Sequence, residues 1–211
     1  MPDLFSDQRP EAQWHGQDIL HLPNAFDADA SLRALKAVFD VSPLRHMKTP
    51  GGQQMSAAMT SAGALGWISD SQGYRYSPID PLTGYAWPDI PPVLLATAQA
   101  AARRYGRAAF APDACLINRY APGARLTAHQ DRDEQDVSIP VVSLSFGASA
   151  RFRIGGQDRA DPMETIILEH GDALVFGRSK RLAYHAVMPM KPGAHPVLGP
   201  DRIVCTFRVA G

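Results

Sequence analysis

Three side chains in the second half of the sequence are of types that bind a transition metal. His129 and Asp131 lie two residues apart in TAHQDRDE, and His185 lies in a later run, LAYHAV. If TAHQDRDE is an extended strand, His129 and Asp131 project from the same face, because side chains alternate along a strand. Two histidines and one carboxylate on one face of an octahedral metal leave open positions, which is typical of non-heme Fe(II) oxygenases. A His-x-Asp tripeptide also arises by chance, so ordinary surface residues remain the alternative.

Two further pairs have the spacing and chemistry to bind an anionic co-substrate. Arg202 and Arg208 are six residues apart in RIVCTFRV, so both fall on one face of a strand. Six residues span roughly 20 Å, so the two arginines can share a small ligand only by leaning together. Asn118 and Tyr120 share a face of LINRY, and their donors suit a carboxylate beside an arginine. A 2-oxo diacid that chelates the metal and reaches Arg202 accounts for both pairs. The alternative is that one or both arginines only cover the mouth of the barrel, with their guanidinium groups in water.

Short strands are the elements expected to position these residues. Seven β-rich runs follow Asp113, separated by turn clusters: ACLINRY, IPVVSLSF, ARFRI, TIILE, ALVF, LAYHAV and RIVCTFRV. So many short runs within about a hundred residues favour a β-sandwich or barrel with outer helices over a parallel α/β sheet. One helix is expected over residues 27–40, behind a capping Asp27. A second is expected from Pro91 to Tyr105, between prolines and Gly106.

The remaining segments complete the predicted organisation of one domain over residues 1–211. Residues 1–42 are interpreted as an N-terminal extension with its helix, and residues 91–211 as a helix followed by the β-rich core. Residues 43–90 are rich in Gly, Pro, Ser, Met and aromatic residues. This composition predicts an irregular, structured loop, which on a rigid β scaffold is a usual place for substrate recognition.

Composition narrows the class of protein. With 211 residues, 45% hydrophobic and 20% charged, the sequence predicts a soluble globular domain, not a disordered chain, a collagen or a disulfide scaffold. Cys115 and Cys205 lack CxxC spacing and are expected to be free, buried thiols. The chain has no apolar run of about 18 residues, and its opening residues show no signal-peptide pattern. We therefore expect a cytoplasmic protein and, at this size, a monomer.

Charge is balanced over the whole chain but not between its ends. Lys and Arg total 21, as do Asp and Glu, yet residues 1–40 hold seven of the acids and only three of the bases. The remainder of the chain is therefore mildly basic. Such a surplus allows attraction to a polyanion such as nucleic acid, while ordinary surface charge explains it equally well.

Longer motifs run in order along nearly the whole sequence. They are TPGG at residues 49–52, MSAAMT at 55–60, LGW ending at Trp67, GYRYSPIDP from Gly73, PDACLINRYAPGA from Pro112, HQDRDE from His129, LEHGD from Leu168 and TFR ending at Arg208. On these motifs the sequence resembles the AlkB family of bacterial Fe(II)- and 2-oxoglutarate-dependent dealkylating dioxygenases. The resemblance implies a mixed α/β chain with a mainly β core: a double-stranded β-helix, or jelly-roll, with flanking helices and an N-terminal nucleotide-recognition lid.

The resemblance also implies roles for individual residues. The Fe(II) ligands would be His129, Asp131 and His185. The far carboxylate of the co-substrate 2-oxoglutarate would meet Arg202 and Tyr120, and its keto-acid end would lie near Asn118 and Arg208. The residues that contact the substrate would be Trp67 stacked on the damaged base, Asp133 near that base and the metal, Tyr74 and Tyr76 at the nucleic-acid backbone, and Arg159 on the substrate side.

The implied reaction is repair of alkylated DNA, with RNA as an open alternative. By this resemblance, O2 and 2-oxoglutarate would demethylate bases such as 1-methyladenine and 3-methylcytosine, releasing formaldehyde, succinate and CO2. Two positions depart from the family pattern. Val204 replaces an Asn that the family usually carries two residues after the first arginine of the last strand, and Phe176 replaces a Trp near the iron.

Two other functions remain open at this stage. The same iron chemistry serves many substrates on one fold, so a protein, lipid or small molecule could replace the nucleic acid. A metal-bearing barrel that binds damaged nucleic acid without turnover is the other alternative. The aromatic composition of residues 43–90 favours a nucleic acid over the first alternative, and succinate production with methylated DNA would exclude the second.

Overall fold

The computed structural model describes residues 9–211; the first eight, part of the opening segment examined for a signal peptide, lie outside the described residues. The helices are α1 (Ala28–Val41), α2 (Pro92–Arg104) and the short 3-10 helix η2 (Arg178–Lys180). The strands are β1 (Gln13–His15), β2 (Ile19–Leu22), β3 (Ala58–Gly63), β4 (Gly66–Asp70), β5 (Gly73–Ser77), β6 (Ala114–Tyr120), β7 (Leu126–His129), β8 (Val141–Gly147), β9 (Ala150–Ile154), β10 (Glu164–Leu168), β11 (Ala173–Phe176), β12 (His185–Val187) and β13 (Arg202–Arg208). No helix among the described residues is long and apolar enough to cross a bilayer.

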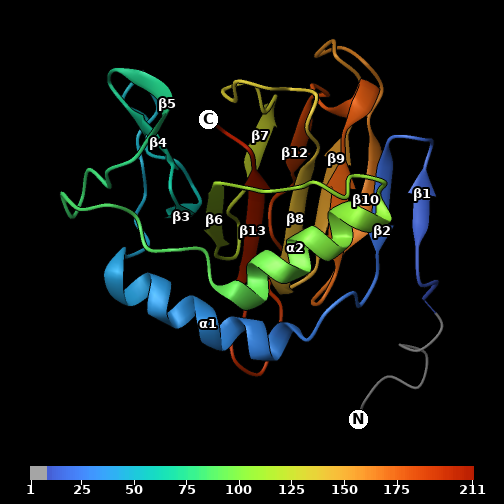
Figure 1. The fold of residues 1–211 in the computed structure, drawn as a ribbon, viewed down its shortest axis with the longest axis horizontal. Helices are drawn as coiled ribbons and strands as arrows, with labels where there is room; N and C mark the ends of the chain where they lie inside the picture. The colour runs from blue at the N-terminus through green and yellow to red at the C-terminus, as the bar shows by residue number, and fades with distance from the viewer. Residues whose placement is uncertain (1–8) are drawn as a thin grey trace.

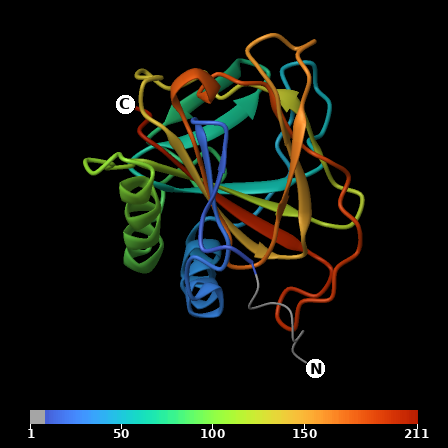
Figure 2. The ribbon, with the colours of Figure 1, turned by 90° about the vertical axis from the view of Figure 1, so that its right-hand side faces the viewer.

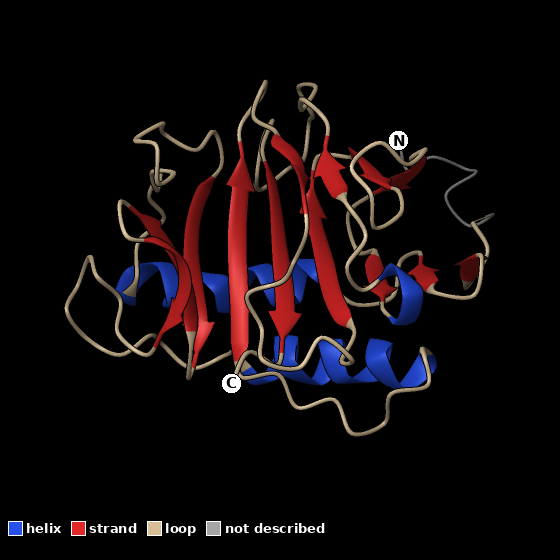
Figure 3. Cartoon of the chain, turned by 90° about the horizontal axis from the view of Figure 1, so that it is seen from above, coloured by secondary structure: helices blue, strands red, loops and turns tan. Residues whose placement is uncertain are grey.

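Two antiparallel sheets form the centre of the molecule. The major sheet has seven strands in the order β1-β2-β11-β8-β13-β6-β3, and the minor sheet has four in the order β10-β9-β12-β7. Strands β6 to β13 are divided between these two sheets, with β6, β8, β11 and β13 in the major sheet and β7, β9, β10 and β12 in the minor sheet, as in a jelly-roll (Figure 1). This confirms the predicted mainly β core. Figure 3 shows the long strands side by side at the centre of the chain.

The helices and the minor sheet cover opposite faces of the major sheet. Both helices lie on the same side of the strands (Figure 2). Leu35 of α1 and Leu94 of α2 are fully buried in a cluster with major-sheet residues such as Phe207. The other face of the major sheet packs on the minor sheet through a second cluster that includes Phe152 and Phe176. The site residues predicted on β6 and β13 belong to this inner layer between the sheets.

Local signals explain why both helices were predictable. The Asp27 side chain accepts a hydrogen bond from the Ala30 N–H at 2.9 Å, which satisfies one free donor of the first turn of α1. Helix α2 begins at Pro92, where a proline costs no backbone hydrogen bond. Gly106, just beyond its end, has a φ of +96°, a left-handed conformation that only glycine adopts easily.

The interpretation of residues 43–90 as one irregular loop is wrong in part. This segment contains β3, an edge strand of the major sheet paired with β6, and a hairpin formed by β4 and β5. The small residues that suggested a loop serve close packing here. A Cβ on Gly66 would lie 2.2 Å from the Trp87 ring, and one on Gly63 would lie 2.3 Å from the Asp113 carbonyl oxygen. The hairpin nevertheless carries three of the five predicted substrate-contacting residues.

Two further details differ from the sequence predictions. The N-terminal extension contains strands β1 and β2, and β2 pairs with β11, so this extension widens the major sheet. The segment TAHQDRDE is not one strand, because β7 ends at His129. Asp131 lies in the loop that follows, and its position beside His129 comes from that loop and not from strand alternation.

Candidate metal centre and its cavity

The structure brings the three predicted metal ligands together. His185 is the direct cross-strand partner of His129 in the pairing of β12 with β7. The Nε2 atoms of both histidines lie 3.7 Å from Oδ1 of Asp131, and their ring centroids are 4.3 Å apart. One nitrogen or oxygen of each residue lies within 4.8 Å of the others, close enough for one ion. Pairing of two strands from distant parts of the sequence therefore builds the cluster.

Backbone carbonyls orient both imidazoles for metal binding. Nδ1 of His129 lies 2.9 Å from the Thr127 oxygen, and Nδ1 of His185 lies 3.0 Å from the Ala183 oxygen. Because a carbonyl only accepts, each Nδ1 carries the proton and each Nε2 keeps a free lone pair. Burial and the neighbouring His129 lower the pKa of His185 to about 4, so its ring is neutral near pH 7.

Asp131 is held as a buried carboxylate. Its side chain is 7% exposed, and Oδ2 accepts hydrogen bonds from Nε and Nη2 of Arg208 at 3.0 and 2.7 Å. Burial alone would raise the pKa of Asp131. The Arg208 guanidinium and the imidazoles of His185 and His129 outweigh burial and hold that pKa well below its ordinary value. The carboxylate is therefore ionised and ready to bind a cation.

Two residues that were not predicted from the sequence hold the loop that carries Asp131 in place. Glu134 is buried; its Oε2 accepts from Arg181 Nη2 at 2.9 Å, and its Oε1 accepts from the Tyr76 hydroxyl at 2.6 Å. Arg181 also donates to the Asp131 carbonyl at 2.6 Å. Four buried charges, those of Asp131, Glu134, Arg181 and Arg208, thus balance beside the metal ligands. Nothing in the run DRDEQD distinguishes Glu134 from its solvated neighbours, so these pairings could not be read from the sequence.

Arg202 is a buried guanidinium that has no carboxylate partner among the described residues. It is 1% exposed, and it donates to the carbonyls of Ala148 and Leu168 and to the Ser145 hydroxyl. Its Nε is buried without any hydrogen-bond partner in the described part of the chain. A buried cation without an anion is costly, and burial lowers the pKa of Arg202 to about 10. This position fits the far carboxylate of 2-oxoglutarate.

The neighbours of Arg202 strengthen this fit. Tyr120 lies directly across from Arg202 in the pairing of β6 with β13, and Asn118 lies across from Val204. Oδ1 of Asn118 is also buried without a partner among residues 9–211. An asparagine in place of Val204 would offer it a donor, so the departure from the family pattern leaves a polar atom free for a ligand.

One cavity of about 400 Å³ connects these groups. All twelve predicted site residues line it: Trp67, Tyr74, Tyr76, Asn118, Tyr120, His129, Asp131, Asp133, Arg159, His185, Arg202 and Arg208. Phe176, the second departure, also lines it and has its ring 5.2 Å from that of His185. The fold therefore brings all the residues predicted for the site into one cavity.

Aromatic side chains from the β4–β5 hairpin and an acidic side chain from the loop after β7 form the mouth of the cavity. Trp67 Nε1 donates to Asp133 Oδ2 at 2.8 Å, and the Trp67 and Tyr74 rings stack at 5.5 Å with 13° between their planes. Arg159 is exposed at the rim, over the Tyr184 ring. Tyr76 lines the cavity, and its hydroxyl points inward and donates to Glu134. Its contact with the nucleic-acid backbone stays a prediction. Tyr74 is 48% exposed.

Fold and cavity together define a class of protein. A jelly-roll with two histidines and a carboxylate facing a buried arginine is the arrangement of an iron- and 2-oxoglutarate-dependent oxygenase. The family model described as the 2OG-Fe(II) oxygenase superfamily matches residues 18–208. Fe(II), 2-oxoglutarate and O2 are thus the cofactor and co-substrates of this class, and the residues that line the cavity fit them.

Closer relatives give the particular family. The alpha-ketoglutarate-dependent dioxygenase AlkB of Salmonella typhimurium is 48% identical over 212 residues, which cover 100% of this chain and 98% of the relative. AlkB of Escherichia coli K12 is 48% identical over 213 residues, with 100% and 99% covered. The solved structure of OsALKBH1 superposes with a TM-score of 0.79 at 28% identity, covering 93% of this chain and 99% of that one. The chain belongs to the AlkB family of dioxygenases.

Partial matches bear on the substrate of the family. ALKBH1C of Arabidopsis thaliana, 42% identical over 46% of this chain, is named a DNA N(6)-methyladenine demethylase. The abh1 protein of Schizosaccharomyces pombe, 34% identical over 40% of this chain, is named a tRNA demethylase. Members of this family therefore act on nucleic acids.

Proposed function

We propose that this dioxygenase repairs N-alkylated bases such as 1-methyladenine and 3-methylcytosine in DNA by oxidative demethylation. One observation carries the proposal: a single cavity joins the metal-ligand cluster to a mouth built by the stacked rings of Trp67 and Tyr74 and the carboxylate of Asp133. Methylation at the pairing edge leaves the base cationic and unable to pair, so it is cheaper to extrude. An indole face and a carboxylate both attract a cationic ring.

In this proposal the inner residues hold the cofactor and co-substrate. His129, Asp131 and His185 bind Fe(II). Arg202 and Tyr120 bind the far carboxylate of 2-oxoglutarate, and Asn118 and Arg208 lie near its keto-acid end. Burial raises the pKa of Tyr120, so its hydroxyl stays protonated and donates to that carboxylate.

The outer residues select and place the substrate. Trp67 stacks on the extruded base, and Asp133 accepts from its polar edge or attracts its charge. Tyr74 and Arg159 are exposed at the rim, where the nucleic-acid backbone would pass. Tyr76 holds the hairpin over the centre through Glu134, and its contact with the nucleic-acid backbone stays a prediction.

The chemistry divides between the bound groups and the chain. When bound, Fe(II), O2 and 2-oxoglutarate supply an oxidation that hydroxylates the N-methyl carbon, with succinate and CO2 as products, and the unstable hemiaminal then releases formaldehyde and the restored base. The chain orients the alkyl carbon toward the metal and keeps Asp131 ionised through Arg208. It also excludes bulk water beneath the hairpin, which limits side reactions.

The decisive experiment measures formaldehyde release from matched methylated and unmethylated single- and double-stranded DNA and RNA, with and without 2-oxoglutarate. Release from methylated DNA that depends on 2-oxoglutarate is the expected result. Succinate formation that no nucleic acid stimulates would indicate another substrate class. Tight binding of methylated DNA without succinate would indicate a barrel that binds damage and does not turn it over. The monomeric state and the cytoplasmic location stay predictions, to be checked by sedimentation and by cell fractionation.

A further inference from the structure

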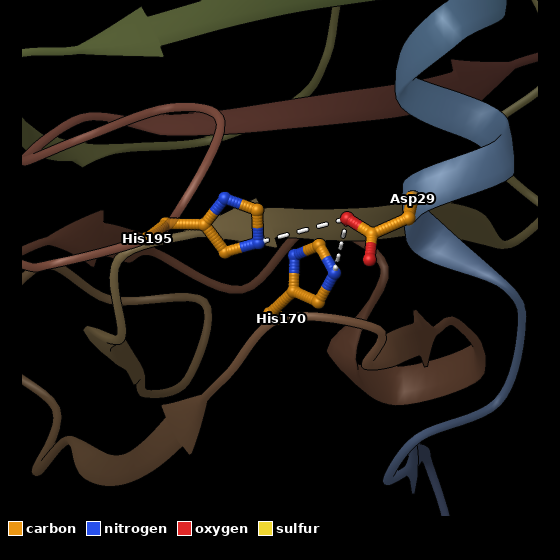
Figure 4. A group of neighbouring side chains, drawn as sticks. All are labelled: Asp29, His170 and His195. Carbon is orange, nitrogen blue, oxygen red and sulfur yellow. Dashed lines mark ion pairs between the residues drawn. The ribbon is translucent and has the colours of Figure 1, made fainter. Parts of the chain in front are cut away.

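A second cluster of two histidines and one carboxylate lies outside the metal-centre cavity. It consists of Asp29 in the first turn of α1, His170 in the turn after β10, and His195 in the loop between β12 and β13 (Figure 4). We call it the distal cluster. Its three residues do not line the cavity described above. Neither histidine indicates chemistry by its sequence position alone, because His195 lies in a loop-like segment and His170 precedes the turn at Gly171.

The dimensions of the distal cluster match those of the metal centre. Nε2 of His170 lies 3.7 Å from Oδ1 of Asp29, and Nε2 of His195 lies 3.8 Å from the same oxygen. The corresponding distances at the metal centre are both 3.7 Å. The two histidine rings are 4.3 Å apart between centroids in each cluster. Within one molecule, therefore, two sites present the same donor set at nearly the same spacing.

The two clusters differ in the atoms behind the imidazoles. At the distal cluster Nδ1 of His170 accepts from the Gly147 N–H at 3.0 Å, and Nδ1 of His195 faces the N–H groups of Val197 and Leu198 at 3.3 Å. A neutral ring that accepts at Nδ1 carries its proton on Nε2. A metal ion that binds Nε2 requires that proton to move to Nδ1, where it faces the donor N–H groups, so the hydrogen bonds at Nδ1 are lost on binding; the metal centre does not have this cost.

We propose that the distal cluster binds a zinc ion through Asp29, His170 and His195, more weakly than the metal centre binds one. Imidazole nitrogen and carboxylate oxygen are ordinary zinc ligands, and three protein ligands with a water complete a tetrahedral site. Misplaced hydrogen bonds behind the ligands reduce metal affinity by about 10- to 100-fold, which sets the expected difference. The bound ion would cross-link α1, the β10–β11 turn and the β12–β13 loop.

Equilibrium dialysis against buffered Zn²⁺, followed by elemental analysis, tests the proposal on the full chain. Zinc is also expected to occupy the metal centre in place of iron, so the wild type should bind two ions, the second at roughly 10- to 100-fold higher free zinc. His195→Ala should bind one ion, at the higher-affinity site. His129→Ala should keep the weaker site. Asp40→Asn is the matched control, since it removes an exposed carboxylate from the same helix and should leave two ions bound.

Asp29→Asn provides a second variant whose folding is not at risk, because the Asp29 side chain is 65% exposed. It should weaken the lower-affinity site and reduce the rise in unfolding temperature that zinc produces in the His129→Ala background. A wild type that saturates at one ion would overturn the proposal. So would a second ion that His195→Ala and Asp29→Asn both retain at unchanged affinity. Neither result would bear on the demethylation assay.

Discussion

At the scale of single residues, the metal centre depends on one buried carboxylate that serves two partners. Asp131 faces the two histidines through Oδ1 and neutralises Arg208 through Oδ2. Removing it therefore deletes the only anionic metal ligand and also leaves a buried guanidinium with a single remaining acid, Glu134 at 3.3 Å. Activity and stability should fall together at this position.

We predict that Asp131→Ala abolishes formaldehyde release and lowers the free energy of unfolding by about 3–5 kcal/mol, the usual result of removing one partner from a buried ion pair. Urea denaturation and a formaldehyde assay measure the two effects. Asp136→Asn is the control, because this acid in the same run is exposed and contacts neither the histidines nor Arg208. Formaldehyde release by Asp131→Ala at the wild-type rate would remove Asp131 from the set of ligands.

Trp67 is predicted from the family resemblance to stack on the damaged base. In the structure it packs at the edge of a buried cluster and stacks on the exposed Tyr74. We predict that Trp67→Ala weakens binding of a methylated oligonucleotide by about 1–3 kcal/mol, the size of one base-stacking contact. A fluorescence titration measures this affinity.

Trp14 offers a matched control for Trp67. It is 47% exposed and stacks on Tyr105, a residue that does not line the cavity. Trp14→Ala should leave oligonucleotide affinity unchanged. Trp67→Phe should keep part of the stacking while losing the hydrogen bond to Asp133. If Trp67→Ala and the wild type bind the oligonucleotide with equal affinity, Trp67 only packs against its neighbours and does not bind the base.

Residue types and spacing could predict which side chains cluster at the proposed metal centre, because the chemistry itself restricts the possible ligands. Few side chains bind Fe(II), and His129, Asp131 and His185 are of those types. The supporting residues are different, because Glu134 and Arg181 are ordinary charges until the fold buries them together. Their partners are distant in the sequence, and no local pattern encodes such a pairing.

At the scale of elements, locally encoded structure was predictable and sheet pairing was not. Both helices follow from capping, proline and glycine residues at or next to the helix ends. Strand β3 reads AMTSAG, and its place beside β6 depends on small residues that permit close backbone approach. The same small residues resemble a loop when only composition is examined. The metal centre likewise depends on the register of β12 against β7, which no single segment specifies.

Asp172 joins the N-terminal strands to the core, and its charge makes that link depend on pH. Its side chain is fully buried and accepts hydrogen bonds from His21 Nε2 at 2.9 Å and Arg9 Nη1 at 2.9 Å, and from the N–H groups of Asn24 and Glu169. Burial alone would raise its pKa, but these donors, His21 foremost, hold the pKa below its ordinary value. The ionised form is therefore the one that the fold stabilises.

We predict that Asp172→Asn lowers the free energy of unfolding by about 1.5–3 kcal/mol near pH 7, the usual range for hydrogen bonds to a charged group. Because the folded pKa is depressed, this stabilisation is complete above the unfolded value of about 3.9 and is lost as the pH falls through the folded value. Urea midpoints of both proteins should therefore converge toward acid. Asp40→Asn, at an exposed pair with Lys36, should cost under about 0.5 kcal/mol. A difference that stays constant down to acid pH would contradict the assignment.

At the scale of the whole molecule, metal and co-substrate sites lie between the two sheets and draw on both. The proposed metal ligands come from the minor sheet and from the loop that follows β7, whereas Arg202, Tyr120 and Asn118 lie on the major sheet. A ligand that binds across this interior binds only when the sheets are assembled. Its binding free energy therefore adds to the stability of the complete fold.

We predict that 2-oxoglutarate, added anaerobically with Mn²⁺ at about 100 times its dissociation constant, stabilises the chain by about 2.7 kcal/mol. For a domain of this size each kcal/mol raises the unfolding temperature by about 2–4 °C, so calorimetry should show a rise of about 5–10 °C. Pyruvate is the matched control: it has the keto-acid end but no far carboxylate, so it leaves the Arg202 guanidinium unpaired and should give a smaller shift. Equal rises in unfolding temperature with the two acids at equal concentration would show that Arg202 does not bind the second carboxylate.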